Sequence, residues 1–294
     1  MENRAKFDFE IFFTNGGSIR GEDFRLDIEG DNISDKQIAD YLVADMRLLM
    51  VGKVNIINKV VFQEKHKRKP FNQASRKMLV DLSHTIEDGL VTYKGLPPPL
   101  ICDYLSREES RKFYDEGTEF QIARIEMVSN TGTYLDCPFH RFENGKDLSE
   151  IELEAFTDLE GIVVRVSYET SLAVSAEHLK NLEIRNRAVL IHTGWDKHWN
   201  TPAYYENHPY LTEDAAEYLR DCGVKLVGID SHNIDNTTRK IRPVHSTLLG
   251  SEILIVEHLC NLQHVPDEEF LFSAIPPKFK GVGTFPVRAM AKIK

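Results

Sequence analysis

The chain has 294 residues, of which 41% are hydrophobic and 28% are charged, and its formal net charge is −10. This composition is that of an ordinary globular protein, and it excludes a disordered chain, a fibre and a disulfide-rich scaffold. The acidic balance also argues against nucleic acid as a partner, because phosphate contacts need clustered lysine and arginine side chains.

The first residues, 1–63, predict a small α+β domain. FDFEIFF and FRLDIEG are strand-like runs on either side of the turn signal NGG. Apolar residues then recur at helical spacing from Ile38 to Leu49, and we expect Ser34 and Gln37 to cap this helix and Gly52 to end it. KVNIINKVVF is typical of a third strand. No motif in this domain indicates a chemical role.

Residues 64–77 (EKHKRKPFNQASRK) form a basic run with six lysines and arginines, one acidic residue and almost no apolar side chains. We interpret this run as a solvated linker between two domains, because runs of like charge usually face solvent. A patch for an anionic partner is the alternative. The linker is favoured because Phe71 is the single aromatic residue within the run.

Residues 78–294 alternate apolar strands with helical segments, which predicts an α/β fold. GIVVRV and AVLIHTGW are typical of buried strands, and KLVGID follows a helix predicted over LTEDAAEYLRDCG. Thr212 is the expected N-cap of that helix, and Gly223 is its expected stop. Ligands of such strand–helix–strand units gather at the carboxyl ends of the strands, here at 192–195 and 230–232.

The cysteines and the N-terminus predict a cytoplasmic protein. The four cysteines lie far apart with no C-x-x-C pair, which is typical of reduced thiols rather than of a zinc knuckle or a disulfide framework. The start, MENRAKFDFEIFF, lacks the parts of a signal peptide. No stretch reaches the roughly 18 apolar residues that cross a bilayer, so no membrane partner is expected.

The segment SNTGTYLDCPFH carries the strongest chemical signal. Asn130, Tyr134, Asp136 and His140 occupy even positions, so their side chains project to one face of an extended chain. Polar side chains on one face are costly to bury unless they share a ligand or a hydrogen-bond network, and the pattern therefore predicts a site. A polar strand facing solvent is the alternative. Cys137 points to the opposite face, which argues against a thiol nucleophile.

These residues resemble the signature of the cyclase/kynurenine formamidase-like family of metal-dependent hydrolases, whose motif is H-x-G-T-H-x-D-x-P-x-H. The positions that match it in register are Gly132, Thr133, Asp136, Pro138 and His140. Three further segments, DLSHTIEDGLVTYKG, VGIDSHNID and HSTLLGSEILIVEHL, resemble family segments and stand in the expected order. The resemblance therefore covers most of residues 78–290.

The resemblance implies a fold, an activity and a ligand set. The fold is the family's swivelling β/α/β-type α/β domain, here preceded by the small α+β domain. The implied activity is hydrolysis of a small cyclic or aryl amide, lactam or lactone, as in an arylformamidase. Carried over by position, the metal ligands are Asp136, His245 and Glu257, and the general acid/base is His140. A homo-oligomer, dimer or tetramer, is also implied.

Two positions depart from the family pattern, because Asn130 and Tyr134 stand where the motif has its first two histidines, both metal ligands. The remaining ligand set is rich in oxygen, which shifts the expected metal from zinc towards manganese or magnesium. Asn130 can add a carbonyl oxygen and Tyr134 a phenol. A free phenol has a pKa of about 10, however, so it is a weak ligand near neutral pH.

Two other functions stay open. One is a metal-poor cyclase or dehydratase in which His140 and Tyr134 carry the chemistry, because an imidazole titrates near pH 6.5 and a phenol can donate to an oxyanion. The other is a non-catalytic family member whose first domain serves as a binding or assembly module.

Further residues are candidates for binding a small-molecule substrate. His84, Trp195 and His232 stand at expected loop or strand ends, and we expect them to contact the substrate. The segment KGLPPP (94–99) is expected to form a rigid loop over the pocket mouth or a plain connection. Aromatic residues that could wall the pocket, or simply pack in the core, are Tyr93, Trp199, Phe113 and Phe120.

Overall fold

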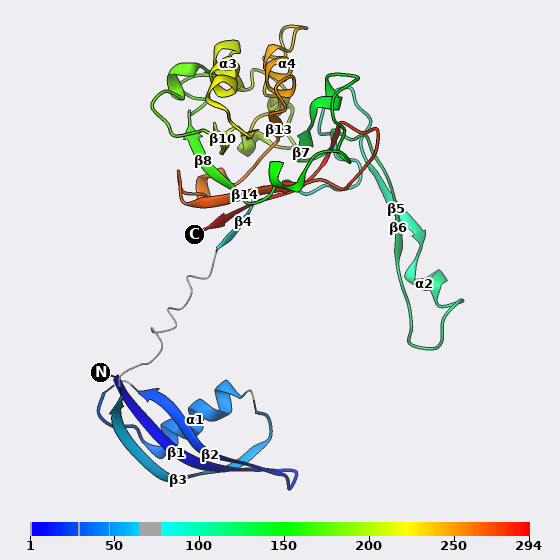
Figure 1. Cartoon of the computed structure of the whole chain (residues 1–294). Helices are drawn as coiled ribbons and strands as arrows, with labels where there is room; N and C mark the ends of the chain where they lie inside the picture. The colour runs from blue at the N-terminus through cyan, green and yellow to red at the C-terminus, as the bar shows by residue number, and fades with distance from the viewer. Residues whose placement is uncertain (1, 29, 47, 65–77) are drawn as a thin grey trace. The chain divides into compact units, whose positions relative to one another are not determined.

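The computed structural model describes residues 2–28, 30–46, 48–64 and 78–294. The chain divides into two compact units, Met1–Ala74 and Ser75–Lys294 (Figure 1). Except for Glu64, the basic linker expected at 64–77 lies outside the described residues. Within the described ranges, no helix has the length and apolar character that crossing a bilayer requires.

The first unit is a three-stranded antiparallel sheet with one helix, in the strand order β2-β1-β3. Its elements are β1 (Glu2–Phe13), β2 (Ser18–Ile28), α1 (Asp35–Asp45) and β3 (Val51–Glu64). Phe7 and Phe9, which project to the same face of β1, pack against Ile38 and Leu42 of α1. This packing buries the apolar stripe that the helix carries.

The start of α1 agrees with its prediction, and its end does not. The predicted capping box is confirmed, because Gln37 N–H donates to Ser34 Oγ and the Gln37 side chain accepts from Ser34 N–H. The expected stop at Gly52 is wrong, because that residue lies within β3. The helix ends at Asp45 because the backbone turns at Met50, with φ +59°, to bring β3 alongside β1.

The second unit is built on a curled nine-stranded sheet (Figure 1). Four parallel strands, β8, β10, β12 and β13, form its centre, and antiparallel strands extend it on both sides in the order β15-β7-β13-β12-β10-β8-β14-β16-β4. The strands are β4 (Leu79–Asp81), β7 (Tyr134–Asp136), β8 (Leu159–Arg165), β10 (Ala188–His192), β12 (Leu226–Ile229), β13 (Leu254–Glu257), β14 (Phe270–Ile275), β15 (Thr284–Pro286) and β16 (Arg288–Ile293).

The predicted strand–helix–strand unit is confirmed. GIVVRV lies at β8, AVLIH is β10 and LVGI is β12, with α3 (Glu213–Cys222) between β10 and β12. Gly223 ends α3 in the left-handed conformation, with φ +74°, as its C-cap position predicts. Thr212 is the N-cap, although its side chain makes no capping hydrogen bond.

Alternate residues of the central strands pack into two cores, one on each face of the sheet. On one face, Val189 packs against α3 and α4 (Pro243–Leu249), which lie side by side (Figure 1). On the other face, Leu190 and Phe270 of β14 belong to the same core. Because both faces are buried, these strands are continuous apolar runs in the sequence.

A two-stranded arm of β5 (Leu100–Leu105) and β6 (Ile122–Glu126) extends from this unit and carries the short helix α2 (Arg107–Ser110) (Figure 1). Phe113 and Phe120 lie on this arm with 72% and 51% of their surface exposed, so they face solvent and not a pocket. The remaining short elements are β9 (Ala173–Val174), β11 (Tyr210–Leu211), and the 3-10 helices η1 (Pro138–His140), η2 (Leu153–Ala155), η3 (Ala176–His178), η4 (Trp195–His198), η5 (Pro202–Tyr205) and η6 (Leu262–His264).

Candidate active site

Strand pairing at the carboxyl end of β13 brings together residues that lie far apart in the sequence. Tyr134 of β7 is the register partner of Glu257, the last residue of β13, and Asp136 is the register partner of Thr284 in β15. Directly opposite residues of an antiparallel pair project to the same face of the sheet. The two pairs therefore place a phenol, two carboxylates and a hydroxyl close to one another.

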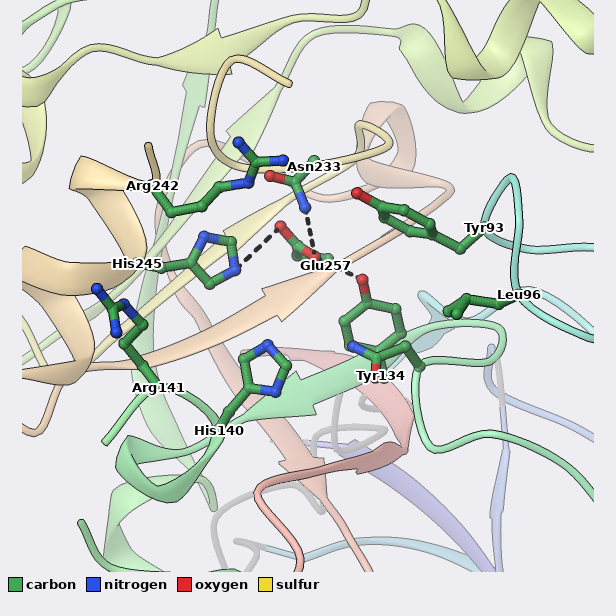
Figure 2. Close-up of a pocket in the computed structure, with 10 residues that line it drawn as sticks. Tyr93, Leu96, Tyr134, His140, Arg141, Asn233, Arg242, His245 and Glu257 are labelled. Carbon is green, nitrogen blue, oxygen red and sulfur yellow. Dashed lines mark hydrogen bonds and ion pairs between the residues drawn. The ribbon is translucent and has the colours of Figure 1, made fainter. Parts of the chain in front are cut away.

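Of these four residues, Tyr134 and Glu257 border a cavity of about 280 Å³ (Figure 2). This volume is close to the lower end of the range for small-molecule sites. Tyr93 and Leu96 bring the 93–99 loop to the cavity, opposite the side formed by α4. The full lining consists of Tyr93, Leu96, Asn130, Tyr134, His140, Arg141, Asn233, Arg242, His245 and Glu257.

The motif segment reaches the cavity in a different way from the one expected. Only Tyr134–Asp136 is a strand, whereas Asn130 lies in a bend and Pro138–His140 forms a 3-10 turn. A single extended face for the whole segment is therefore wrong, because Pro138 cannot continue the strand ladder and the chain turns there. Asn130 and His140 still line the cavity from the two ends of the strand. Cys137 is buried in the core.

The three expected metal ligands lie close together. His245 Nε2 is 3.6 Å from Asp136 Oδ2 and 3.8 Å from Glu257 Oε1. All three side chains are buried, and Asp136 Oδ2 has no hydrogen-bond partner among the described residues. A buried carboxylate oxygen without a partner is costly, and a cation between the three groups would satisfy it. Because Asp136, His140 and His245 also offer ligand atoms within 4.8 Å of one another, the residues present fit a divalent ion.

Asp235 holds the His245 ring in place. His245 Nδ1 lies 2.6 Å from Asp235 Oδ2, and the same carboxylate accepts from the backbone N–H groups of Val244 and His245 in α4. Since Nδ1 is engaged, Nε2 is the nitrogen that faces Asp136 and Glu257. Sequence reasoning missed Asp235, although it lies in the family-like segment VGIDSHNID.

The carboxylates around His245 set its charge. Burial opposes protonation of His245, but the nearby carboxylate of Asp136, the hydrogen bond to Asp235 and the charge of Glu257 outweigh burial and raise its pKa to about 10. Burial also raises the pKa of Glu257 to about 7, against the lowering effect of His245. In the absence of metal, the imidazolium therefore supplies the positive charge that these carboxylates require.

Tyr134 donates to Glu257. Its hydroxyl lies 2.6 Å from Glu257 Oε2, and 1% of the residue's surface is exposed. Burial and the charges of Glu257 and Asp136 raise the pKa of Tyr134 well above 10, so the phenol stays protonated. Ile234 N–H donates to Glu257 Oε1 at 2.6 Å, and Asn233 Nδ2 lies 3.4 Å from Oε2. Glu257 is thus held by donors on both oxygens.

Thr284 connects His140 to Asp136. The Thr284 hydroxyl donates to Asp136 Oδ1, and its oxygen lies 2.7 Å from His140 Nδ1. Because the hydroxyl proton points to the carboxylate, the oxygen accepts from a protonated Nδ1, and Nε2 of the neutral ring is left as an acceptor. The His140 side chain is 34% exposed and lines the cavity, so it presents a basic nitrogen there.

Gly283 makes the contact between Thr284 and His140 possible. A Cβ at Gly283 would lie 2.3 Å from the backbone nitrogen of His140, so a larger residue would push β15 away from the turn. Sequence reasoning missed Gly283 and Thr284, because neither belongs to a recognised motif and their partners lie more than a hundred positions earlier.

The residues expected to bind substrate lie behind or away from the cavity. His84 stacks on Trp199 with ring centroids 3.9 Å apart, and His232 packs against Tyr93, whose ring lines the cavity. Trp195 is buried, and its Nε1–H donates to a backbone carbonyl. Of the aromatic residues considered for the pocket wall, Tyr93 reaches it directly.

Buried histidines with neutral rings lie behind the cavity wall to which Tyr93 belongs. Burial lowers the pKa of His84 to about 4, that of His232 to about 3, and that of His258 well below 6.5. Four buried ring nitrogens of these residues have no hydrogen-bond partner within the described part of the chain. This side of the cavity is therefore uncharged, in contrast to the carboxylate side.

Comparison with known proteins gives one family and a consistent set of relatives. The model of the Putative cyclase family matches residues 80–236. A kynurenine formamidase of Geobacillus thermodenitrificans is 28% identical over 212 residues, which are 71% of this chain and 95% of that protein. A kynurenine formamidase of Bacillus thuringiensis is 26% identical over 215 residues, which are 72% of this chain and 96% of that protein.

Solved structures share the fold. A potential metal-dependent hydrolase with cyclase activity superposes with a TM-score of 0.61 at 24% identity, covering 74% of this chain and 98% of that one. Isatin hydrolase A from Labrenzia aggregata superposes with a TM-score of 0.63 at 21% identity, covering 74% and 93%. At these identities the likeness shows the fold alone.

Proposed function

Because the chain belongs to the putative cyclase family, we propose that it is a metal-dependent hydrolase of a small cyclic or aryl amide, lactam or lactone. The observation that carries this proposal is the convergence of Asp136, His245 and Glu257 beside His140. The kynurenine formamidases and the isatin hydrolase found by comparison support it, since both names describe cleavage of a carbonyl–nitrogen bond.

Asp136, His245 and Glu257 would hold a divalent metal ion, and His140 also offers a ligand atom within 4.8 Å of those of Asp136 and His245. When bound, such an ion polarises a carbonyl group and lowers the pKa of a water molecule. Two carboxylates and one imidazole are a harder donor set than the family motif provides, and they favour manganese or magnesium over zinc.

His140 serves as the general acid/base. Its Nε2 takes a proton from water while the water oxygen bonds to the carbonyl carbon of the substrate. It then returns the proton to the leaving nitrogen of an amide, or the leaving oxygen of a lactone, as that bond breaks. Thr284 supports this role, because its contact with Nδ1 keeps Nε2 free.

A second candidate function rests on Tyr134. Its protonated hydroxyl lines the same cavity and can donate to a developing oxyanion, which would serve a metal-poor cyclase or dehydratase together with His140. The hydrolase is preferred because this hydroxyl already donates to Glu257. A non-catalytic family member is the third candidate.

Metal content and turnover, measured together, test the proposal. We expect the full-length chain to bind manganese stoichiometrically and to hydrolyse aryl formamides or isatin, and Asp136→Asn to lose both properties. Glu252→Gln is the control, because it removes a carboxylate that is 61% exposed and pairs with Lys146 outside the cavity. Metal-free turnover that His140→Gln abolishes would favour the cyclase or dehydratase. A chain with neither metal nor turnover would contradict both enzymes.

We also infer a homo-oligomer, dimer or tetramer. The support is the exposed arm, on which Tyr104, Phe113 and Ile125 expose 75%, 72% and 58% of their surface. Light scattering of the full-length chain tests this inference, and a monomer at all micromolar concentrations would contradict it. A cytoplasmic location stays a prediction, which the four free cysteines support.

A further inference from the structure

We propose that the substrate carries a carboxylate, and that Arg242, assisted by Arg141, binds this group at the edge of the cavity. The inference rests on the proposed hydrolase function, because it names the substrate class of the same site. It assigns a binding role to two residues that lie outside the metal ligand set and outside the family-like motifs quoted above.

Among the described residues, the contacts of Arg242 are made by one terminal nitrogen. Its Nη1 donates to the backbone carbonyls of Arg239 and Ile241 at 2.5 and 3.0 Å. Within the described ranges, Nε and Nη2 have no hydrogen-bond partner. The side chain is partly buried and, like Asn233, lines the cavity (Figure 2). The structure therefore presents a positioned guanidinium with one free edge.

Arg141 lies on the other side of His245 (Figure 2). Its Nε donates to Ser246 Oγ at 3.2 Å, and its guanidinium lies 5.3 Å from the centroid of the Phe142 ring. Among the described residues, neither Arg141 nor Arg242 forms an ion pair with a carboxylate. In a chain with 46 acidic and 36 basic residues, two such arginines on one small cavity indicate an anionic ligand.

The geometry favours a carboxylate over a phosphate. A guanidinium edge with two parallel donors matches the two oxygens of a carboxylate, whereas a phosphate dianion needs donors from more directions. Arg242 has one such edge left, because Nη1 is already bound. The cavity of about 280 Å³ also has room for a ligand of roughly one ring with a short acidic side chain.

The charges of the cavity explain why arginines are needed. Asp136 and Glu257 are buried carboxylates, so a second anion near them is repelled. Arg242 and Arg141 offset that repulsion on the His245 side, while Tyr93 and Leu96 form the opposite wall (Figure 2). A substrate that places its carboxylate on the arginines therefore lays its apolar part against Tyr93 and its scissile bond near His140.

Equilibrium binding of a matched pair of probes tests this inference without turnover. Phenylacetate and its neutral analogue phenylacetamide are titrated calorimetrically into the full-length chain, with and without a chelator. We expect phenylacetate to bind about tenfold more tightly than phenylacetamide, because a charge-assisted bidentate pair is made only with the anion. Arg242→Gln should remove this preference and leave the affinity for phenylacetamide within about twofold.

Arg239→Gln is the matched control. It removes the same charge three positions away, from a side chain that lines a different cavity, and it should keep the preference for phenylacetate. Equal binding of both probes to the wild type would overturn the inference. A preference for phenylacetate that survives the double variant Arg141→Gln/Arg242→Gln would overturn it as well, and so would a preference that the chelator alone abolishes. Tighter binding of phenyl phosphate than of phenylacetate would also overturn it.

The two proposals fail in different ways. A chain that hydrolyses neutral amides and ignores the charge of the probe would keep the hydrolase function and lose the carboxylate site. A chain that prefers phenylacetate through Arg242 but has neither metal nor turnover would keep the binding site and lose the hydrolase function.

Discussion

The hydroxyl of Tyr134 donates a hydrogen bond of 2.6 Å to Oε2 of Glu257, at the position where the family motif has a metal-binding histidine. The two residues are register partners across β7 and β13, so the pair is fixed by the sheet. A histidine at this position would bind the same metal ion as Glu257, whereas Tyr134 donates a hydrogen bond to the Glu257 carboxylate directly.

Tyr134→His should therefore tighten zinc binding. The imidazole adds a nitrogen ligand and removes a donor that competes with the metal for Glu257. We expect the zinc dissociation constant to fall by about tenfold or more, measured by competition with a chromophoric chelator. Tyr134→Phe, which removes the donor without adding a ligand, is the control and should change the constant less. Equal constants for all three proteins would refute this account of the substitution.

Metal binding should release a proton from His245. Its raised pKa of about 10 means that the ring is protonated near neutral pH, whereas a metal ligand must be neutral. The apparent association constant should therefore rise by about tenfold per pH unit between about pH 7 and 9, and more steeply below pH 7, where Glu257 is also protonated. Calorimetry in buffers of different ionisation enthalpy counts the protons. A pH-independent constant without proton release would contradict the prediction.

His140→Gln should abolish most of the activity and leave metal binding in place. General acid/base residues contribute about 10²–10⁴-fold to the rate, and we expect a fall in kcat of that order. His264→Gln is the matched control, because His264 is an exposed histidine outside the cavity. The measurements are kcat and bound manganese. Loss of manganese together with activity would indicate that His140 acts as a ligand and not as the base.

Thr284→Val should disturb the orientation of the His140 ring. Removing the hydroxyl breaks the contact with His140 Nδ1 and the hydrogen bond to Asp136, so the ring loses the partner that fixes its tautomer. We expect kcat to fall by about tenfold. Thr284→Ser keeps the hydroxyl and should keep kcat. An unchanged kcat in Thr284→Val would show that Thr284 has only a packing role.

His232 should make the fold less stable in acid. Its pKa of about 3 in the folded chain lies below the ordinary 6.5, because burial disfavours the imidazolium. Between these values the unfolded chain binds a proton that the folded chain does not, so stability falls as the pH falls. Wild type should lose about 1.4 kcal/mol per pH unit relative to His232→Gln between about pH 6 and 4. Urea unfolding at several pH values measures this difference, and parallel curves for the two proteins would contradict it.

The central part of the fold could be predicted because its signals are local. The strands at 159–165 and 188–192 follow directly from short, continuous apolar runs, and the helix α3 follows from a pattern of period 3.6. The end of α1 could not be predicted, because it depends on how β3 pairs with β1. The apolar spacing continues to Leu49, yet the chain must turn at Met50 to enter that pairing.

The residues of the candidate site also fall into those that the sequence predicts and those that it does not. Asp136, His140, His245 and Glu257 stand in recognisable segments, so the family resemblance predicts that they lie close together. Thr284 is not predicted, because its contact with His140 depends on strand register across more than a hundred residues. Side-chain contacts such as the one that orients the His140 ring produce no periodic pattern of residues in the sequence.

The close approach of Gly283 to the backbone of His140 restricts how the loops around the site can be engineered. Since a Cβ there would lie 2.3 Å from a backbone nitrogen, the turn at 138–141 and the strand start at 283–284 form a single interlocked surface. A loop transplanted from a relative into one of these segments will fit only if its counterpart is transplanted with it. Libraries that aim to change substrate preference should leave both segments intact and vary the 93–99 loop instead.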